Sequence, residues 1–445
     1  MGEFGIGQPV TRTEDPRLLR GGGRFVDDIT LPGTVYGAVL RSTYAHARIR
    51  SIDTSAAKAA PGVIAVLTDE DWRARGWRDL PGAELPLKRP DGSAIYKPVF
   101  APMARGSVRW VGEAIAFVVA GTSAEAYDAV ELIAVDYEPL PTVIGTERAL
   151  EAGQALVWPD AADNICYVWQ GGDKAAAEAA FAGAAHVVST KAVINRITAA
   201  TMEPRAALSH YDAAADRLTV YATVQRAFAY RSQIAEIMGI PESKVRVVST
   251  DVGGGFGMKT ALYGETTLTM LATMVTGRPV KWTASRSESF LGDAHARDHV
   301  YDISLALDPD GKFLGLKSKS VVNVGAYVQA GGESSAIANI GTLAGVYVFP
   351  AIHADVTVVF SHTNPMRAYR GNGRGEAAYA IERVIDVAAD TLDIDPVELR
   401  RKNMIAPEQM PYKTGLVFTY DAGDFANAMD KALAMADWTG FAKRR

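Results

Sequence analysis

The sequence of 445 residues contains a single cysteine, Cys166. One thiol excludes a disulfide framework, a structural zinc site built on several thiolates and a cysteine-ligated iron–sulfur cluster within this chain. Because unpaired cysteines are among the most buried residues in proteins, we expect Cys166 to be a small buried side chain.

The chain also lacks a basic excess and long apolar runs. Its 46 Lys and Arg face 51 Asp and Glu, a formal net charge of −5, which argues against a protein that binds nucleic acid or a membrane surface. No apolar run approaches the ~18 residues of a membrane helix, and the first residues show no basic start followed by an apolar stretch, as a secretory leader would. We therefore expect a cytoplasmic protein with a small-molecule substrate and with neither nucleic acid nor membrane as a partner.

Glycine is abundant, with 41 residues, and clustered at 21–23, 253–257 and 370–375. Glycine clusters between strongly patterned segments are typical of tight turns where the backbone closely approaches something else. The patterns predict strands at 35–42, 62–68, 114–121, 186–194, 217–224, 244–252, 279–284, 300–307, 313–324 and 353–360, and helices at 173–185, 227–238, 262–275, 370–392 and 395–403. The segment 123–137 is predicted to be a helix that runs into a strand. This mixture, which does not strictly alternate, predicts an α+β protein with a domain boundary in the proline-containing segment 136–145.

The first glycine loop, GGGFGMKT at 253–260, follows a predicted strand and precedes a predicted helix. Such a loop presents backbone N–H groups to an anion. It nearly matches a nucleotide-binding P-loop from Gly253 to Thr260 but has Met258 where that loop needs glycine. A tight turn with Lys259 in solvent is the structural alternative.

The second loop, AYRGNGRGE at 368–376, places Arg370 and Arg374 between glycines just before a helix. Arginines held there can meet an anion or a developing negative charge, or pair with a carboxylate on the surface. The segment HARDH at 295–299 lacks the glutamate of the zinc-protease helix, so we expect it on the surface. The sequence also lacks the G-x-S-x-G of serine hydrolases and a G-x-G-x-x-G after a strand.

Taken together, these loops resemble those of the molybdenum hydroxylase large subunit, the family of xanthine dehydrogenase and aerobic carbon monoxide dehydrogenase. Further motifs fit this family in the same order, and the resemblance spans almost the whole chain: RTEDPRLLRGGGRFVDDITLPG (12–33), VGEAIAFVVA (111–120), VDYEPLP (135–141), MEPRAAL (202–208) and LRRKNMI (399–405). The resemblance implies an N-terminal extension at 1–17, an α/β hammerhead-type domain at 18–140 and the first half of the molybdopterin-binding domain at 146–445.

The resemblance also implies roles for single residues. Gln225 matches the glutamine whose amide faces the metal's oxo ligand, and Arg370 matches an active-site arginine that stabilises negative charge on the substrate. The implied contacts with the cofactor lie in the two glycine loops: Gly254, Gly255, Phe256, Gly257, Arg370 and Gly371. No side chain of this chain is expected to ligate the metal directly.

Two departures from the family pattern bear on the substrate. The branch that oxidises carbon monoxide carries a cysteine where Gly371 stands, so a copper–sulfur bridge cannot form here. Purine-oxidising relatives carry an acid at the position of Thr260 and an aromatic residue at that of Asn372. The substrate could therefore be an aldehyde, an N-heterocycle or a similar carbon compound, and the sequence leaves these alternatives open.

The resemblance thus implies an oxidoreductase subunit that hydroxylates carbon with oxygen from water. It would hold a molybdopterin-type molybdenum cofactor, with the cytosine dinucleotide as one possible form, and pass electrons to [2Fe–2S] and FAD groups on partner subunits. The alternatives are a non-catalytic molybdopterin-binding or assembly module and a P-loop-like nucleotide binder. In the family the catalytic base is a glutamate of a second molybdopterin-binding domain, so we expect a C-terminal half or a partner chain to supply it, and we expect structural roles for Glu113 and Glu376.

Overall fold

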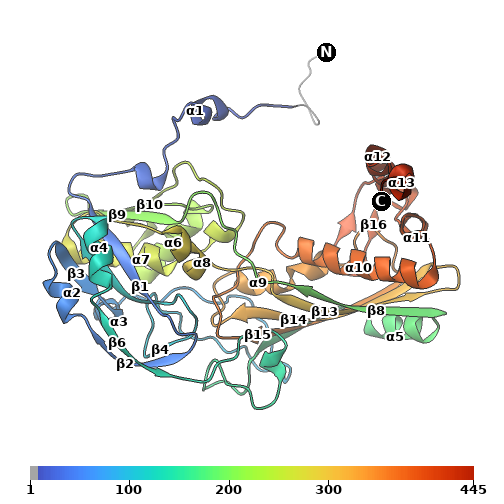
Figure 1. Ribbon diagram of the computed structural model, residues 1–445, viewed down its shortest axis with the longest axis horizontal. Coiled ribbons are helices and arrows are strands. Elements are labelled where there is room, and N and C mark those ends of the chain that lie inside the picture. The colour runs from blue at the N-terminus through green and yellow to red at the C-terminus, as the bar shows by residue number, and fades with distance from the viewer. Residues whose placement is uncertain (1–8) are drawn as a thin grey trace.

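Two β-sheets organise the computed structural model, which describes residues 9–445 (Figure 1). The larger sheet has seven strands in the order β11-β10-β9-β12-β1-β5-β3. Its strands are β1 (Val35–Arg41), β3 (Val63–Leu67), β5 (Ala114–Ala120), β9 (Ala206–Asp212), β10 (Arg217–Ala222), β11 (Val245–Val248) and β12 (Val280–Thr283).

The second sheet has five strands in the order β7-β15-β14-β13-β8 and extends to the right in Figure 1. Its strands are β7 (Ile165–Gly172), β8 (His186–Ile194), β13 (His299–Leu307), β14 (Phe313–Gly325) and β15 (Ala351–Phe360). Smaller sheets are formed by β2 (Ala47–Asp53), β4 (Ser107–Val108) and β6 (Ala134–Pro139), and by β16 (Tyr412–Lys413) with β17 (Thr419–Tyr420).

The helices cover these sheets. α10 packs on β8 and β13, while α5 packs on β14 and β15 across the same sheet (Figure 1). The helices are α1 (Asp15–Leu19), α2 (Ser55–Ala59), α3 (Asp69–Ala74), α4 (Ser123–Val130), α5 (Lys174–Ala182), α6 (Ala227–Met238), α7 (Gly264–Thr276), α8 (Arg286–Gly292), α9 (Gly332–Ile337), α10 (Arg374–Leu392), α11 (Pro396–Asn403), α12 (Phe425–Met435) and α13 (Phe441–Arg444). Within the described residues, every helix is too short or too polar to cross a bilayer.

The α+β class is confirmed, because helices cover sheets whose strands are paired mostly antiparallel. The segment 136–145, however, does not separate two sheets. Strands from both sides of it share the seven-stranded sheet, because β1 pairs in parallel with β12 and places Val35 opposite Val280. The sequence division at 18–140 and 146–445 stays a prediction, and residues 1–8 of the expected N-terminal extension lie outside the described part of the chain.

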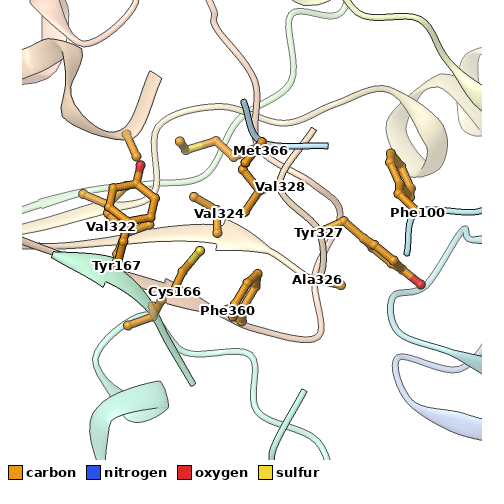
Figure 2. Packing of buried hydrophobic residues seen from close by; sticks show 14 of the residues in the cluster. Phe100, Cys166, Tyr167, Val322, Val324, Ala326, Tyr327, Val328, Phe360 and Met366 are labelled. Atoms are coloured by element: carbon orange, nitrogen blue, oxygen red, sulfur yellow. The ribbon is translucent and has the colours of Figure 1, made fainter. Parts of the chain in front are cut away.

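The core is continuous between the two sheets. Figure 2 shows Tyr327, which follows β14, reaching towards Phe100, and the two rings stack at 4.6 Å between centroids. Cys166 in β7 is fully buried in the same cluster, as expected, and burial raises the pKa of its thiol. Apolar side chains from both halves of the chain therefore fill one core.

Glu113, just before β5, lies at this junction and is 3% exposed. Its carboxylate accepts hydrogen bonds from the Arg109 backbone N–H and from the Tyr327 hydroxyl, the latter at 3.1 Å. Burial raises the pKa of Glu113 to about 7, although both hydrogen bonds oppose that shift. This environment is that of a structural carboxyl group.

The raised pKa of Glu113 predicts a pH-dependent stability. Above its ordinary pKa the unfolded carboxyl releases its proton while the folded one keeps it, so the stabilisation is present at low pH and is lost as pH rises through 7. In Glu113→Gln the side chain stays neutral at both pH values. The fall in the free energy of unfolding between pH 5 and pH 8 should therefore be smaller in the variant than in the wild type, by up to about 3 kcal/mol. Urea denaturation at both pH values measures this, and equal declines in the wild type and the variant would contradict it.

Candidate functional site

The first glycine loop starts earlier and ends later than its glycines suggest. β11 ends at Val248, before the expected Val252, and α7 begins only at Gly264, after a short 3-10 turn over Met258–Thr260. The loop backbone is left-handed at Phe256 and Gly257, with φ of +50° and +100°. The N–H groups of the loop, rather than a helix N-terminus, therefore form the candidate cradle.

Gln225 packs against this loop from the end of β10. Its Oε1 accepts a hydrogen bond from the Gly257 N–H at 2.9 Å, and its own backbone N–H donates to the Lys259 carbonyl at 2.9 Å. A Cβ at Gly255 would lie 2.5 Å from the Gln225 side chain. Because Oε1 is occupied and the side chain is exposed, the Gln225 amide N–H₂ is left to donate to a bound group.

Arg370 joins the same site through its backbone. Its N–H donates to the Phe256 carbonyl at 2.8 Å, and its carbonyl accepts from Arg297 Nη2 at 2.9 Å. The Phe256 and Tyr369 rings meet edge to face, 6.5 Å apart. The structure thus brings together Gln225, the loop of Gly254, Gly255, Phe256 and Gly257, and the Arg370–Gly371 pair, although they lie far apart in the sequence.

The two arginines of the second loop differ. The Arg370 side chain is exposed, whereas Arg374 folds back so that its Nη1 donates to the Gly371 carbonyl at 3.1 Å. α10 begins at Arg374 and not at residue 370. Among the described residues the Arg370 side chain has no hydrogen-bond partner, so Arg370 remains the candidate of this loop to meet a ligand.

Lys259 is not in solvent, and it does not reach outward as a P-loop lysine does. It is completely buried, and its Nζ lies 2.9 Å from both Glu203 Oε2 and the Glu203 carbonyl. Glu203 Oε2 also accepts the Gly253 N–H at 2.7 Å. Burial lowers the pKa of Lys259, although Glu203 opposes this shift. Glu203 therefore joins the two ends of the loop, Gly253 and Lys259. Because the lysine is buried in this ion pair and cannot reach a phosphate, the P-loop interpretation is wrong.

The expectation that residues 295–299 lie on the surface is also wrong. His299 is 1% exposed, and Asp298 accepts hydrogen bonds from Arg196 Nε at 2.7 Å and from Asn323. Arg297 forms an ion pair with Glu376 and holds the Arg370 carbonyl. Sequence reasoning missed this role because Arg297 and Asp298 adopt left-handed backbone angles of +68° and +64°, for which the sequence carries no glycine signal.

The tight approach of the two loops predicts a strong effect of Gly257→Ala. A Cβ there would lie 2.7 Å from the Ala368 carbonyl oxygen, and the left-handed φ adds strain. We expect the variant to lose most of its bound molybdenum and pterin, measured by metal analysis and pterin fluorescence. Gly239→Ala is the matched control, because Gly239 has φ of +67° with open space around its Cβ position, and it should keep its cofactor content while losing about 1 kcal/mol of stability.

The donor set fits a large anionic organic cofactor. The Gln225 amide, the N–H groups of the loop and the exposed Arg370, whose backbone binds the Phe256 carbonyl, meet at Phe256, a residue that is 44% exposed. Donors of this kind suit phosphate and pterin oxygens. A Cβ at Gly255 would clash with Gln225 and one at Gly257 with Ala368, so the packing of the loop requires glycine at both positions.

Comparisons with known proteins bear on the family and the fold of this chain. A family model described as the molybdopterin cofactor-binding domain matches residues 157–404, and one described as the aldehyde oxidase and xanthine dehydrogenase a/b hammerhead domain matches residues 20–141. The carbon monoxide dehydrogenase large chain of Hydrogenophaga pseudoflava is 37% identical over 440 residues, which cover 96% of this chain and 53% of that protein. This chain thus spans about half the length of that relative.

Two further relatives bear on the fold and on the length. The crystal structure of Cu,Mo-CO dehydrogenase in its carbon monoxide reduced state superposes with a TM-score of 0.91 at 34% identity, covering 99% of this chain and 56% of that one. The nicotinate dehydrogenase large molybdopterin subunit of Eubacterium barkeri is 30% identical over 400 residues, covering 89% of each protein. The chain therefore belongs to the molybdenum hydroxylase large-subunit family, which includes the large chains of xanthine dehydrogenase and aerobic carbon monoxide dehydrogenase.

Proposed function

We propose that this chain binds a molybdopterin-type cofactor as part of an oxidoreductase that hydroxylates an aldehyde, an N-heterocycle or a similar carbon compound. The observation that carries the proposal is the meeting of Gln225, the loop at 253–257 and Arg370 at one exposed site. When bound, the cofactor supplies the redox chemistry that inserts water-derived oxygen into a C–H bond.

The residues of this chain have separate tasks in the proposed reaction. The Gln225 amide N–H₂ would donate to the bound cofactor, because the Gly257 N–H already occupies the amide oxygen. The glycine loop holds the pterin, with Phe256 as an apolar wall. Arg370 stabilises negative charge that develops on the substrate, and this stabilisation becomes strong when a further protein surface covers the site and excludes water.

We propose that the catalytic base comes from a C-terminal half or a partner chain. The carboxylates close to the site are already engaged: Glu203 with Lys259, and Glu376 with Arg297. Glu113 is enclosed at the core junction. Exposed apolar side chains flank the site in sequence, with Met202 89% and Phe228 79% exposed, which supports a further protein surface covering it.

Electrons must leave the site for another redox group. We propose iron–sulfur and flavin subunits as partners, because the single thiol, Cys166, is buried and cannot hold a cluster. The cytosine dinucleotide is one option for the form of the pterin. Among substrates we favour aldehydes and N-heterocycles over carbon monoxide, since Gly371 offers no thiolate for copper, and the name of the Eubacterium barkeri relative includes nicotinate, an N-heterocycle.

Metal and pterin analysis of the purified protein, with any subunits that co-purify, tests the proposal. We expect stoichiometric molybdenum and pterin, and dye reduction only when the chain or subunit that supplies the base is present. Cofactor that transfers to an acceptor protein, without turnover in any complex, would favour an assembly module. A protein without molybdenum or pterin contradicts the proposal, and turnover by the chain alone that is lost in Glu376→Gln contradicts the external base.

A further inference from the structure

Arg367 is a buried cation that forms no ion pair with a carboxylate of residues 9–445. It is 7% exposed, and its Nη2 donates to the Thr260 hydroxyl at 3.3 Å. Its Nε and Nη1 have no hydrogen-bond partner among the described residues. Since a guanidinium carries five N–H donors, most of its hydrogen-bonding capacity is unused.

The position of Arg367 connects it to the site. The Thr260 hydroxyl that receives its hydrogen bond donates in turn to the Gly257 carbonyl at 2.6 Å. Arg367 precedes Arg370 by three residues, and its Nη1 lies 3.2 Å from the Cβ position of Gly331. The Thr260 hydroxyl therefore links the Arg367 guanidinium to the glycine loop. The guanidinium also lies next to Gly331, which has no side chain.

Other buried arginines of this protein are fully paired. Arg205 contacts Asp293 at 2.6 Å and Glu265 at 2.8 Å, and Arg41 contacts Glu265 at 2.6 Å. Around Arg367, by contrast, burial lowers the pKa of the guanidinium, Glu333 opposes that shift and Arg226 adds to it. Glu333 accepts the Glu84 N–H with Oε1 at 3.1 Å, while its buried Oε2 has no hydrogen-bond partner among the described residues and forms no ion pair with Arg367. Burying a charge without a partner destabilises a protein. A site that keeps a buried guanidinium in this state is therefore suited to bind an anion.

We propose that Arg367, assisted by Thr260, determines substrate specificity by binding a carboxylate of the substrate. The proposal rests on the proposed function and narrows its substrate class to aldehydes or N-heterocycles that carry a carboxylate. A planar guanidinium can bind a carboxylate through two parallel hydrogen bonds, and the N–H of Nη2 that does not face Thr260 can form such a pair with the unpartnered Nε or Nη1. Arg367 would then hold the acid group while the reacting carbon faces the cofactor.

Binding of benzoate and of neutral benzamide, measured by calorimetry on the purified protein with its co-purifying subunits, tests this inference. We expect wild type to bind benzoate at least 10-fold more tightly than benzamide. Arg367→Met should weaken benzoate binding by about 10- to 100-fold, in line with the loss of charge-assisted hydrogen bonds, and leave benzamide binding unchanged. Arg367→Lys should recover part of the loss. Arg374→Met is the matched control and should bind benzoate like wild type.

Thermal stability distinguishes binding from a structural role. If Arg367 awaits an anion, Arg367→Met should have an equal or higher Tm without benzoate. A lower Tm in Arg367→Met that Arg367→Met/Glu333→Gln restores would show that Arg367 serves Glu333, and would overturn the inference. Equal benzoate affinity in wild type and Arg367→Met, or no benzoate binding by wild type, overturns it as well. Molybdenum and pterin content of the same samples reports separately on the proposed function.

Discussion

Arg370→Ala is expected to lower kcat of the molybdenum-loaded protein by about 10²- to 10³-fold while its molybdenum and pterin content stays near that of wild type. The contacts that join the two loops at this residue belong to its backbone: its N–H binds the Phe256 carbonyl, and its carbonyl binds Arg297. Alanine keeps both. The variant therefore loses only the exposed guanidinium, which we expect to stabilise charge during the reaction.

Steady-state kinetics with a dye acceptor, together with metal analysis of the same preparations, measure the effect. Arg370→Lys should fall between alanine and wild type, because it keeps the charge but not the planar fork. Arg374→Ala is the control on the same loop, because its side chain folds back on Gly371. A loss of activity in proportion to lost molybdenum would assign Arg370 to cofactor retention and contradict the prediction.

Glu265→Ala is expected to destabilise the protein by about 3–5 kcal/mol. Glu265, 5% exposed in α7, accepts from Arg205 Nη1 at 2.8 Å and from Arg41 Nη2 at 2.6 Å. Burial alone would raise its pKa, but the two arginines lower it below its usual range. Alanine would leave two buried guanidinium groups short of a partner, one of them on β1 and the other just before β9.

Urea denaturation measures this loss, with Asp216→Ala as the control. The Asp216–Lys244 ion pair has exposed side chains, and such pairs contribute less than about 1 kcal/mol. Because the pKa of Glu265 lies below its unfolded value, its contribution is present above pH ~4.5 and is lost as pH falls towards the folded pKa. Equal losses for the two variants at pH 7 would contradict the role of this buried network.

Local patterns predicted much of the fold. The uninterrupted apolar run at 114–121 became β5, buried at every position, and the helix expected at 227–238 became α6 with the same bounds. The segment 123–137, expected to be a helix that runs into a strand, became α4 (Ser123–Val130), which Thr122 caps, followed by β6 (Ala134–Pro139). The pairing of β1 with β12 could not be predicted, because nothing near either strand specifies so distant a partner.

Of the candidate site, too, only a part could be predicted from the sequence. Motifs marked Gln225, Phe256 and Arg370, and the structure places them together. The residues behind them escaped prediction: Lys259 looks like a solvent-exposed loop residue until Glu203 is placed beside it. Arg297 and Arg367 likewise depend on contacts with residues far away in the sequence.

The shared sheet has a consequence for synthesis on the ribosome. β1 emerges early, but the strand that completes its second edge, β12, follows 245 residues later, since Val35 pairs with Val280. At translation rates of about 5–20 residues per second, β1 waits roughly 12 to 50 seconds with one edge unpaired. During that interval the nascent chain exposes a strand edge open to wrong partners, so this protein should depend on chaperones more than one whose halves complete their sheets in order.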